Sequence, residues 1–464
     1  MAPLSGFDHH LHNSQAITFK QDYELIQSLN LNTSEIEYRR YCLTASAQYG
    51  LRRQSLMELD WSFFNATVAD RVFVNPPFNN GENQAVFPLC QQTHVIQVPL
   101  DGSAFSTDTG TLLLGTATFL TRLNESLPEM AHWLTNTGTK LLVVLRDQSP
   151  KEEEMRAVMN RAEDLGIAVF LVSDSSMTGE AESNFGLAEH LYTHLHYSTR
   201  WIGVIDDDTF FPSLHRILEA LTPYDPTMPW YIGGLTERHL GISTEGFKAW
   251  GGAGIFLSVP LLTLLAENHD TCISMSRTWG DALWRDCIFN ITSPTVHLTR
   301  LDGLHQLDMF GDLSGWYESG LASTLLSLHH WKSWHYFNVP SAHLVTNITG
   351  VDALFQRYDA TDNVVFTNGY SIAQYPGGLP DMGLVEGTMF PYPGAKMPDA
   401  AGEFQDSLGK LRPALEEGRE KISWRFVTAV SMGSACVRQF YVRGASAGQS
   451  VDSVIEVDWC RSSR

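Results

Sequence analysis

Basic residues are scarce in this chain of 464 residues, which has 31 lysines and arginines against 52 aspartates and glutamates and a net charge of −21. Nucleic acids and anionic membranes bind to basic surfaces, so this balance argues against both as partners. Hydrophobic residues make up 43% of the chain and charged residues 18%, which indicates a folded protein rather than a disordered one.

Long apolar runs are also lacking. No stretch reaches the roughly 18 apolar residues of a membrane-spanning helix, and the first residues contain no signal-peptide core. No two cysteines have the C-x-x-C spacing of a zinc knot or redox motif. The six cysteines fall instead into three sequential pairs, which we expect to form the disulfides Cys42–Cys90, Cys272–Cys287 and Cys436–Cys460.

Sequons for N-glycosylation are frequent. Five occur, at Asn32, Asn65, Asn124, Asn290 and Asn347. Together with the even number of cysteines they indicate the secretory pathway. We therefore expect this chain to be an ectodomain whose membrane anchor lies outside it.

Strand and helix patterns alternate from residue 111 onward. Apolar runs at 111–115, 141–145, 167–172 and 201–205 read as strands, with amphipathic helical patterns between them. This alternation predicts an α/β fold with a mainly parallel sheet covered by helices on both faces. No G-x-G-x-x-G follows the first strand, which argues against a dinucleotide cofactor.

The flanking segments have a different character. Residues 1–105 show only short strand-like pieces and predict an irregular N-terminal flanking region. Residues 106–345 contain the regular α/β pattern. Residues 346–464 predict a C-terminal extension that ends in β-rich segments.

The acids Asp206, Asp207 and Asp208 directly follow the buried strand at 201–205, and Pro212 starts the next helix. Ligands of open α/β sheets bind at the carboxyl ends of the strands. Adjacent acids repel one another, and a divalent cation relieves that repulsion. Oxygen ligands suit Mg²⁺ or Mn²⁺. The alternative is a solvated acidic turn or a helix cap.

Glycines and one further acid extend this pattern. The stretch Trp250-Gly-Gly-Ala-Gly254 allows close approach of the backbone to a ligand, although a tight turn between strands is the alternative. Asp281 lies between Cys272 and Cys287, where a disulfide would fix its loop, and it is also placed to cap a helix.

Five motifs occur in one order: Trp201–Phe211 with its Asp-Asp-Asp, Tyr-Ile-Gly-Gly at 231–234, Gly-Gly-Ala-Gly at 251–254, Gly280-Asp281 and His-Gln-Leu-Asp at 305–308. Over about residues 111–335 the chain resembles the Fringe-like glycosyltransferases of family 31, in the plant and fungal branch. The resemblance implies the GT-A fold, a Rossmann-like mixed sheet. It also implies an inverting, β-1,3-type hexosyltransferase of the Golgi lumen or secretory pathway, in a type II membrane protein.

The resemblance further implies a UDP-sugar donor, a Mn²⁺ or Mg²⁺ ion bound to a D-x-D motif, and a glycan, protein or small-molecule acceptor. Asp208 would be the main metal ligand, with Asp206 and His305 beside it. Asp206 and Asp207 would also contact the ribose side or hold a water molecule next to the metal. Asp281 matches the position of the catalytic base, with Asp308 in reserve. Fringe itself has two acids where this chain has Gly280-Asp281.

Weaker candidates complete the predicted site. Thr116, Thr118 and Arg122 follow the first strand, where the family holds the nucleotide, and Asp147 ends the second strand and could accept from a uracil N–H. The backbone at Gly252 and Gly254 and the ring of Trp250 would line the sugar pocket. Thr116 and Thr118 could equally cap a helix, and Trp250 could be a core residue. His329 and His330 match the family's S-L-H-H motif, and no chemistry is assigned to them.

Two other classes of function compete with this one. A secretory carbohydrate-binding protein could keep the fold without catalysis, and a metal-dependent phosphodiesterase or phosphatase also uses clustered acids. The second would require more ligands around paired metals than the sequence indicates.

Overall fold

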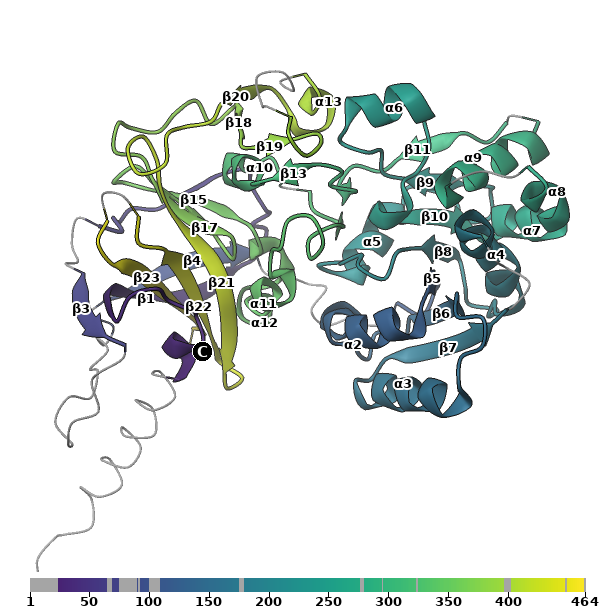
Figure 1. Cartoon of the computed structure of the whole chain (residues 1–464), viewed down its shortest axis with the longest axis horizontal. Helices are drawn as coiled ribbons and strands as arrows, with labels where there is room; N and C mark the ends of the chain where they lie inside the picture. Colours follow the sequence, from purple (N-terminus) through teal and green to yellow (C-terminus); the bar gives the residue numbers. More distant parts are fainter. Residues whose placement is uncertain are drawn as a thin grey trace, which may run out of the picture.

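A computed structural model describes most of the chain, and its two large sheets lie side by side (Figure 1). The teal half contains the α/β sheet, whereas the other half joins purple N-terminal strands to yellow C-terminal strands. The described residues are 24–462 except 65–68, 75–89, 91, 100–108, 175–178, 276–278, 294, 323, 396–401 and 447–448.

The first sheet has seven strands among the described residues, in the order β11-β9-β10-β8-β5-β6-β7. Strands β8, β5, β6 and β7 are parallel, and β10 is antiparallel to β8 and β9. The predicted mixed, mainly parallel sheet is therefore confirmed. The strands are β5 (Leu112–Thr118), β6 (Lys140–Leu145), β7 (Ala168–Ser173), β8 (Trp201–Val204), β9 (Tyr231–Gly233), β10 (Ile255–Ser258) and β11 (Leu298–Arg300).

Helices cover both faces of this sheet. Successive side chains of a strand point to opposite faces, and β5 accordingly places Leu112 and Leu114 in one hydrophobic core and Leu113 in another. The first core contains α2 (Leu120–Leu134), α3 (Glu152–Asp164) and α5 (Leu214–Leu221). The second contains α4 (Glu180–Thr193), α7 (Val259–Glu267), α8 (His269–Ile273) and α9 (Gly280–Ile291).

The second sheet has ten strands among the described residues, and it unites the two ends of the chain. Their order is β2-β15-β16-β17-β21-β22-β23-β1-β3, with β4 also beside β1. They are β1 (Glu35–Gln48), β2 (Met57–Glu58), β3 (Asp70–Phe73), β4 (Thr93–Pro99), β15 (Arg357–Ala360), β16 (Val364–Thr367), β17 (Ser371–Gln374), β21 (Ile422–Met432), β22 (Cys436–Arg443) and β23 (Asp452–Arg461).

Strand β1 is longer and more regular than the sequence indicated. It runs parallel to β23, with Ile36 opposite Asp452. Its apolar alternation is interrupted in the sequence by Arg39 and Arg40, and Arg40 is accommodated by an ion pair with buried Glu456 at 2.6 Å. The N-terminal and C-terminal segments thus share one sheet, and the division of the chain at residues 105 and 345 stays a prediction.

Further short elements lie between the strands of the two sheets. They are α6 (His239–Glu245), β12 (Leu304–His305), β13 (Phe310–Gly311), α10 (Ser314–Ser319), β14 (Ser327–Leu328), α11 (Val339–His343), α12 (Thr346–Thr349), β18 (Val385–Gly387), β19 (Met389–Phe390), α13 (Gln405–Leu408) and β20 (Leu411–Pro413). Strand β12 pairs with β14, β13 with β19 and β18 with β20.

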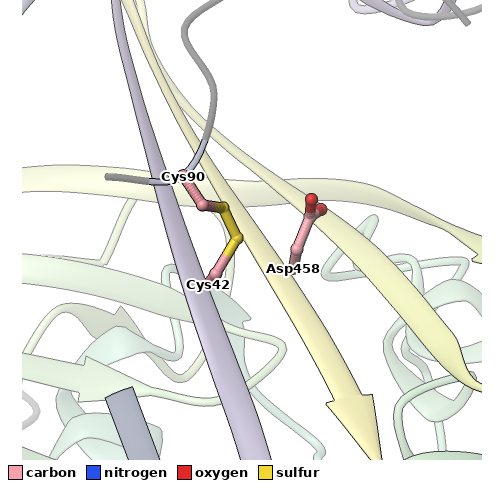
Figure 2. Close-up of side chains that lie close together, drawn as sticks. All are labelled: Cys42, Cys90 and Asp458. Atoms are coloured by element: carbon pink, nitrogen blue, oxygen red, sulfur yellow. A yellow bond between two sulfur atoms is a disulfide. The ribbon is translucent and has the colours of Figure 1, made fainter. Parts of the chain in front are cut away.

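The three predicted disulfides are confirmed. Cys272 of α8 is bonded to Cys287 of α9, and Cys436 of β22 faces its partner Cys460 across the β22–β23 ladder. Figure 2 shows the third bond, between Cys42 and Cys90, with the carboxylate of Asp458 beside it. Because both sulfur atoms of this group are oxidised, they are not available as metal ligands. None of the helices in the described part of the chain has the length and apolarity to span a membrane.

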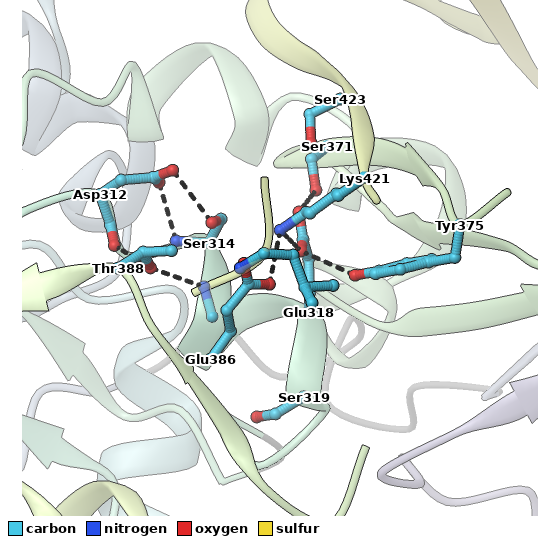
Figure 3. Close-up of polar contacts among 12 residues, drawn as sticks. Asp312, Ser314, Glu318, Ser319, Ser371, Tyr375, Glu386, Thr388, Lys421 and Ser423 are labelled. Carbon is cyan, nitrogen blue, oxygen red and sulfur yellow. Dashed lines mark hydrogen bonds and ion pairs between the residues drawn. The ribbon is translucent and has the colours of Figure 1, made fainter. Parts of the chain in front are cut away.

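A buried charge network holds α10 against the second sheet (Figure 3). Lys421 lies 2.5 Å from Glu318 Oε2 and 3.0 Å from Glu386 Oε2, and all three side chains are buried. Ser371 donates a hydrogen bond to Glu318 at 2.7 Å. Burial alone would raise the pKa of Glu318, but Lys421 and Arg425 lower it below its ordinary value. The network fixes the connection between the two halves of the molecule.

We expect the Lys421→Met substitution to lower the free energy of unfolding by about 3 kcal/mol, because it removes the cation that two buried carboxylates share and leaves only Arg425 and Arg412 beside them. Chemical unfolding measures this loss. The control is Lys151→Met, since Lys151 forms an exposed pair with Glu154 and should leave the unfolding midpoint unchanged. Equal midpoints for both variants would show that the network does not stabilise the fold.

Candidate functional site

The three consecutive acids follow β8 but face different surroundings. The side chain of Asp206 is 43% exposed, whereas those of Asp207 and Asp208 are 4% and 8% exposed. Thr209 holds the turn, because its hydroxyl accepts from the Asp206 N–H at 3.0 Å and donates to the Gly252 carbonyl at 2.9 Å. The three acids therefore lie in a hydrogen-bonded turn that packs against the glycine-rich stretch, and they do not form a solvated acidic loop.

Asp207 is bound by residues at the end of β5 and in the first turn of α2. Thr118 donates a hydrogen bond to one of its oxygens, and the Arg122 guanidinium pairs with the other. Arg122 itself lies on α2 and is 55% exposed. The structure thus brings together three of the residues predicted to bind the nucleotide, with Asp207 as the acid that orients Arg122.

Asp208 and Asp206 converge on His329. The His329 Nε2 atom lies 3.0 Å from Asp208 Oδ1 and 3.4 Å from Asp206 Oδ2. Although burial lowers it, the hydrogen bond and charge of Asp208 and the charge of Asp206 raise the pKa of His329 to about 9. Burial would raise the pKa of Asp208, but His329 lowers it well below its ordinary range. Although the Asp206 side chain is partly exposed, desolvation raises its pKa to about 7, with the charges of Asp281 and Asp208 in the same direction and that of His329 opposing them.

Gly252 creates the space that His329 occupies. A Cβ at position 252 would lie 2.2 Å from the imidazole, so only glycine allows the ring to pack there. The segment that carries His329 is fixed by Leu328, which exchanges backbone hydrogen bonds with Phe210 at 2.8 and 2.9 Å. The buried Nδ1 atom of His329 has no hydrogen-bond partner in the described part of the chain.

His330 and Asp308 form a second pair beside this cluster. The Nε2 atom of His330 lies 3.2 Å from Asp308 Oδ1, and its ring stacks on Trp334 with 3.8 Å between centroids. Ligand atoms of Asp208, His329 and His330 all lie within 4.8 Å of one another, which is close enough to share one metal ion.

His305 lies outside this group. Its Nδ1 atom is 3.2 Å from Glu237 Oε1, and the other Glu237 oxygen accepts from the Leu307 N–H at 2.7 Å. Glu237 is buried, so the imidazole of His305 is oriented by a structural carboxylate. The structure therefore places His329, and not His305, beside Asp206 and Asp208.

Asp281, in the first turn of α9, lies on the other side of the glycine stretch. Its Oδ1 atom accepts from the Gly251 N–H at 3.1 Å, and its Oδ2 atom lies 3.8 Å from Lys248 Nζ. Burial raises the pKa of Asp281, while Lys248 opposes that shift. Gly251 contacts Asp281 and Gly252 contacts His329, so two consecutive glycines bring the acid and the cluster together.

The remaining predicted residues have local structural contacts. Asp147 accepts from the Leu120 N–H at 2.7 Å, at the start of α2, and its contact with a base stays a prediction. Thr116 is buried in β5. Gly254 has a left-handed φ of 103° that a side chain would strain. Trp250 lies under Lys248, whose Nζ is 4.0 Å from the ring centroid.

Three residues of the site were not assigned any role from the sequence. His329 belongs to the S-L-H-H motif, but it lies more than 120 residues after the acids in the sequence. The sequence alone therefore did not indicate that they are in contact. Glu237 and Lys248 carried no signal, because a single acid or lysine outside a motif reads as a surface residue.

The donor set at the end of β8 suits a divalent ion. Two carboxylates and an imidazole are the ligands that Mn²⁺ and Zn²⁺ accept, and carboxylates also suit Mg²⁺. A bound ion would take the place of the proton that His329 Nε2 now shares with the acids, since a ligating histidine is neutral. The buried Nδ1 atom of His329 has no hydrogen-bond partner in the described part of the chain, and the ring fits only because residue 252 is a glycine. A buried polar atom without a partner destabilises the fold, and such atoms are typical of functional residues.

We expect His329→Ala to weaken Mn²⁺ binding at least 10-fold, because it removes a donor atom beside Asp208. His305→Ala is the matched comparison, and its Mn²⁺ affinity should stay within about 3-fold of wild type. Calorimetric titration of Mn²⁺ into both variants measures this. A larger loss for His305→Ala than for His329→Ala would return the ligand role to His305.

Comparison with known proteins covers part of the chain. Residues 243–366 match a family described as "Protein of unknown function, DUF604". A β-1,3-glucosyltransferase from Mus musculus is 27% identical over 121 residues, which are 26% of this chain and 24% of that protein. The chain thus matches about a quarter of the length of this relative. Membership of the Fringe-like family stays a prediction.

Solved structures give weaker matches. Mouse xyloside xylosyltransferase 1 in its apo form has a TM-score of 0.28 and 12% identity, over 44% of this chain and 88% of that one. A mannosyltransferase from Pyrobaculum calidifontis in complex with GDP-Man and Mn²⁺ has a TM-score of 0.25 and 14% identity, over 34% of this chain and 46% of that one. The strand order of this chain is the firmer description of its fold.

Proposed function

We propose that this protein is a metal-dependent inverting glycosyltransferase with a GT-A-type donor site, which transfers a hexose or N-acetylhexosamine from a UDP-sugar to an acceptor hydroxyl. One observation carries the proposal. Asp206, Asp208 and His329 converge at the carboxyl end of β8, with Asp281 across the turn at Gly251 and Gly252.

The leaving group of such a transfer is a nucleoside diphosphate, whose charge must be stabilised. A bound Mn²⁺ or Mg²⁺ ion, held by Asp208, His329 and Asp206, would supply that stabilisation. Arg122 is paired with Asp207 but is more than half exposed, so its guanidinium can still donate hydrogen bonds to a phosphate. The metal ion and Arg122 would thus place positive charge beside a diphosphate that binds to this acidic protein.

Inversion requires a base that accepts the proton of the attacking hydroxyl on the face opposite the leaving group. Asp281 has one oxygen fixed by the Gly251 N–H and a carboxyl whose pKa is raised by burial, which brings it closer to the pH at which a base works best. Asp308 is bound to His330, so its oxygens are less available for this role.

The partial match to a β-1,3-glucosyltransferase agrees with this class and with a β-1,3 linkage. Three disulfides and exposed sequons at Asn32, Asn290 and Asn347 agree with the Golgi lumen or secretory pathway. A carbohydrate-binding protein without catalysis is the second candidate. The complete set of acids and His329 favours the enzyme.

The test is a screen for UDP release from a panel of UDP-sugars, each with Mn²⁺ and with EDTA. We expect release from one donor that requires the metal. Absence of release from every donor, together with absence of UDP binding by calorimetry, would contradict the enzyme and favour the binding protein.

A further inference from the structure

A cavity of about 280 Å³ lies between the segment 307–337, which follows the first sheet, and β21 with the residue before β17 in the second sheet. Aromatic and polar side chains line it together. They include Trp331, His335, Tyr336, Tyr370, Asp312 and Arg425. The volume is slightly below the roughly 300 Å³ at which pockets for drug-sized ligands begin, so it suits a single ring rather than an extended chain.

The cavity shares its walls with the candidate metal site. Leu307 lines the cavity and directly precedes Asp308, and Trp331 lines it and directly follows His330. Neighbouring Cα atoms are about 3.8 Å apart. The Trp331 indole also donates to the backbone carbonyl of Asp208 at 2.7 Å. The walls of the cavity are therefore formed by the same loops that carry Asp308, His329 and His330.

The polar side of the cavity offers both donors and acceptors. Arg425 pairs with Asp312, which also accepts from the Tyr370 hydroxyl at 3.2 Å. Asp312 also accepts from the Ser314 N–H at 2.9 Å and from the Ser314 hydroxyl at 3.0 Å. The Arg425 and Asp312 side chains nevertheless remain 36% and 43% exposed, so a ligand can reach both of them. Glu318, held by Lys421, lies 3.6 Å from Arg425 Nη1 and fixes the guanidinium from behind. Vicinal hydroxyls of a sugar match such a donor–acceptor pair.

The apolar side carries an exposed aromatic ring on a strained backbone. Tyr336 is 83% exposed and has a left-handed φ of 49°. Leu307 and His330, in the two loops that form the wall, are also left-handed, with φ of 57° and 53°. Bulky residues rarely adopt this conformation, and such strain concentrates at ligand-binding sites. Packing does not explain an exposed tyrosine held in this way.

We infer that this cavity is the acceptor subsite and that it binds one pyranose ring of a glycan acceptor. Tyr336 would stack on the apolar face of the ring, and Asp312 and Arg425 would bind its hydroxyls. This inference rests on the proposed function, because only a transferase has an acceptor. The binding of a sugar ring in the cavity can be tested independently of that function.

The probes are methyl β-D-glucopyranoside, methyl β-D-galactopyranoside and methyl N-acetyl-β-D-glucosaminide. Saturation-transfer NMR with the full chain measures their binding. We expect one of the three to bind the wild type, Tyr336→Ala to weaken that binding at least 5-fold, and Tyr336→Phe to keep it within 2-fold. Tyr197→Ala, at a tyrosine that is 88% exposed elsewhere, is the control and should bind as the wild type does.

The outcomes separate this inference from the proposed function. Glycoside binding that depends on Tyr336, without metal-dependent UDP release, would support the subsite and contradict the transferase. UDP release without glycoside binding, or equal binding by Tyr336→Ala, would overturn the subsite and leave the transferase standing. Unchanged thermal unfolding of Tyr336→Ala would show that a weaker affinity is not a loss of fold.

Discussion

The Asp208→Asn substitution is expected to lower metal-dependent UDP release at least about 100-fold. Asp208 is buried, its carboxylate is the acid closest to His329, and the substitution removes its charge from the donor set. Stabilisation of a leaving diphosphate by a metal amounts to several kcal/mol, and each 1.36 kcal/mol corresponds to a tenfold change in rate. The measurement is kcat for UDP release at saturating donor and Mn²⁺.

The matched control is Asp164→Asn at the exposed end of α3, which loses the same charge away from the site and should keep the wild-type rate. Near-UV circular dichroism checks that both variants keep their packing. Undiminished kcat in a folded Asp208→Asn variant would remove this residue from the metal site.

The Asp281→Asn substitution is expected to separate binding from transfer. An asparagine oxygen can still accept from the Gly251 N–H, so the turn should persist and UDP·Mn²⁺ affinity should stay within about 3-fold of wild type. An amide cannot accept the proton of the acceptor, and loss of a general base lowers rates by about 10²–10⁴-fold. Calorimetry for UDP and a transfer assay with the identified acceptor measure the two quantities.

The comparison variant is Asp308→Asn, because Asp308 is the other acid near the site. We expect it to reduce transfer less than Asp281→Asn does, since Asp308 is bound to His330. If Asp281→Asn retained transfer while Asp308→Asn lost it, the base would be Asp308.

The α/β half of the molecule could be predicted because its signals are local. Each parallel strand from β5 to β8 is a short apolar run followed by its own helix, and β8 places the acids at its carboxyl end. The second sheet could not be predicted in this way. Strand β1 pairs with β23 across more than 400 residues, and no local pattern encodes that register.

The site, like the fold, could be predicted only in part from the sequence. The acids after β8 and Asp281 lie on either side of the turn at Gly251 and Gly252, and their roles stay predictions. The choice between His305 and His329 depends on how β12 and β14 lie side by side, because the His329 N–H bonds to the His305 carbonyl while the two imidazoles have different partners. Sequence spacing cannot show which of two neighbouring histidines points to the acids.

The central claim is that the acids and His329 hold a divalent ion for a nucleoside diphosphate. The most direct measurement is a titration of Mn²⁺ into the wild-type protein with and without saturating UDP. Because coupling between two ligands is reciprocal, a shared site predicts that UDP tightens Mn²⁺ binding at least about 10-fold, which is about 1.4 kcal/mol. An Mn²⁺ affinity that is unchanged by UDP would contradict the account.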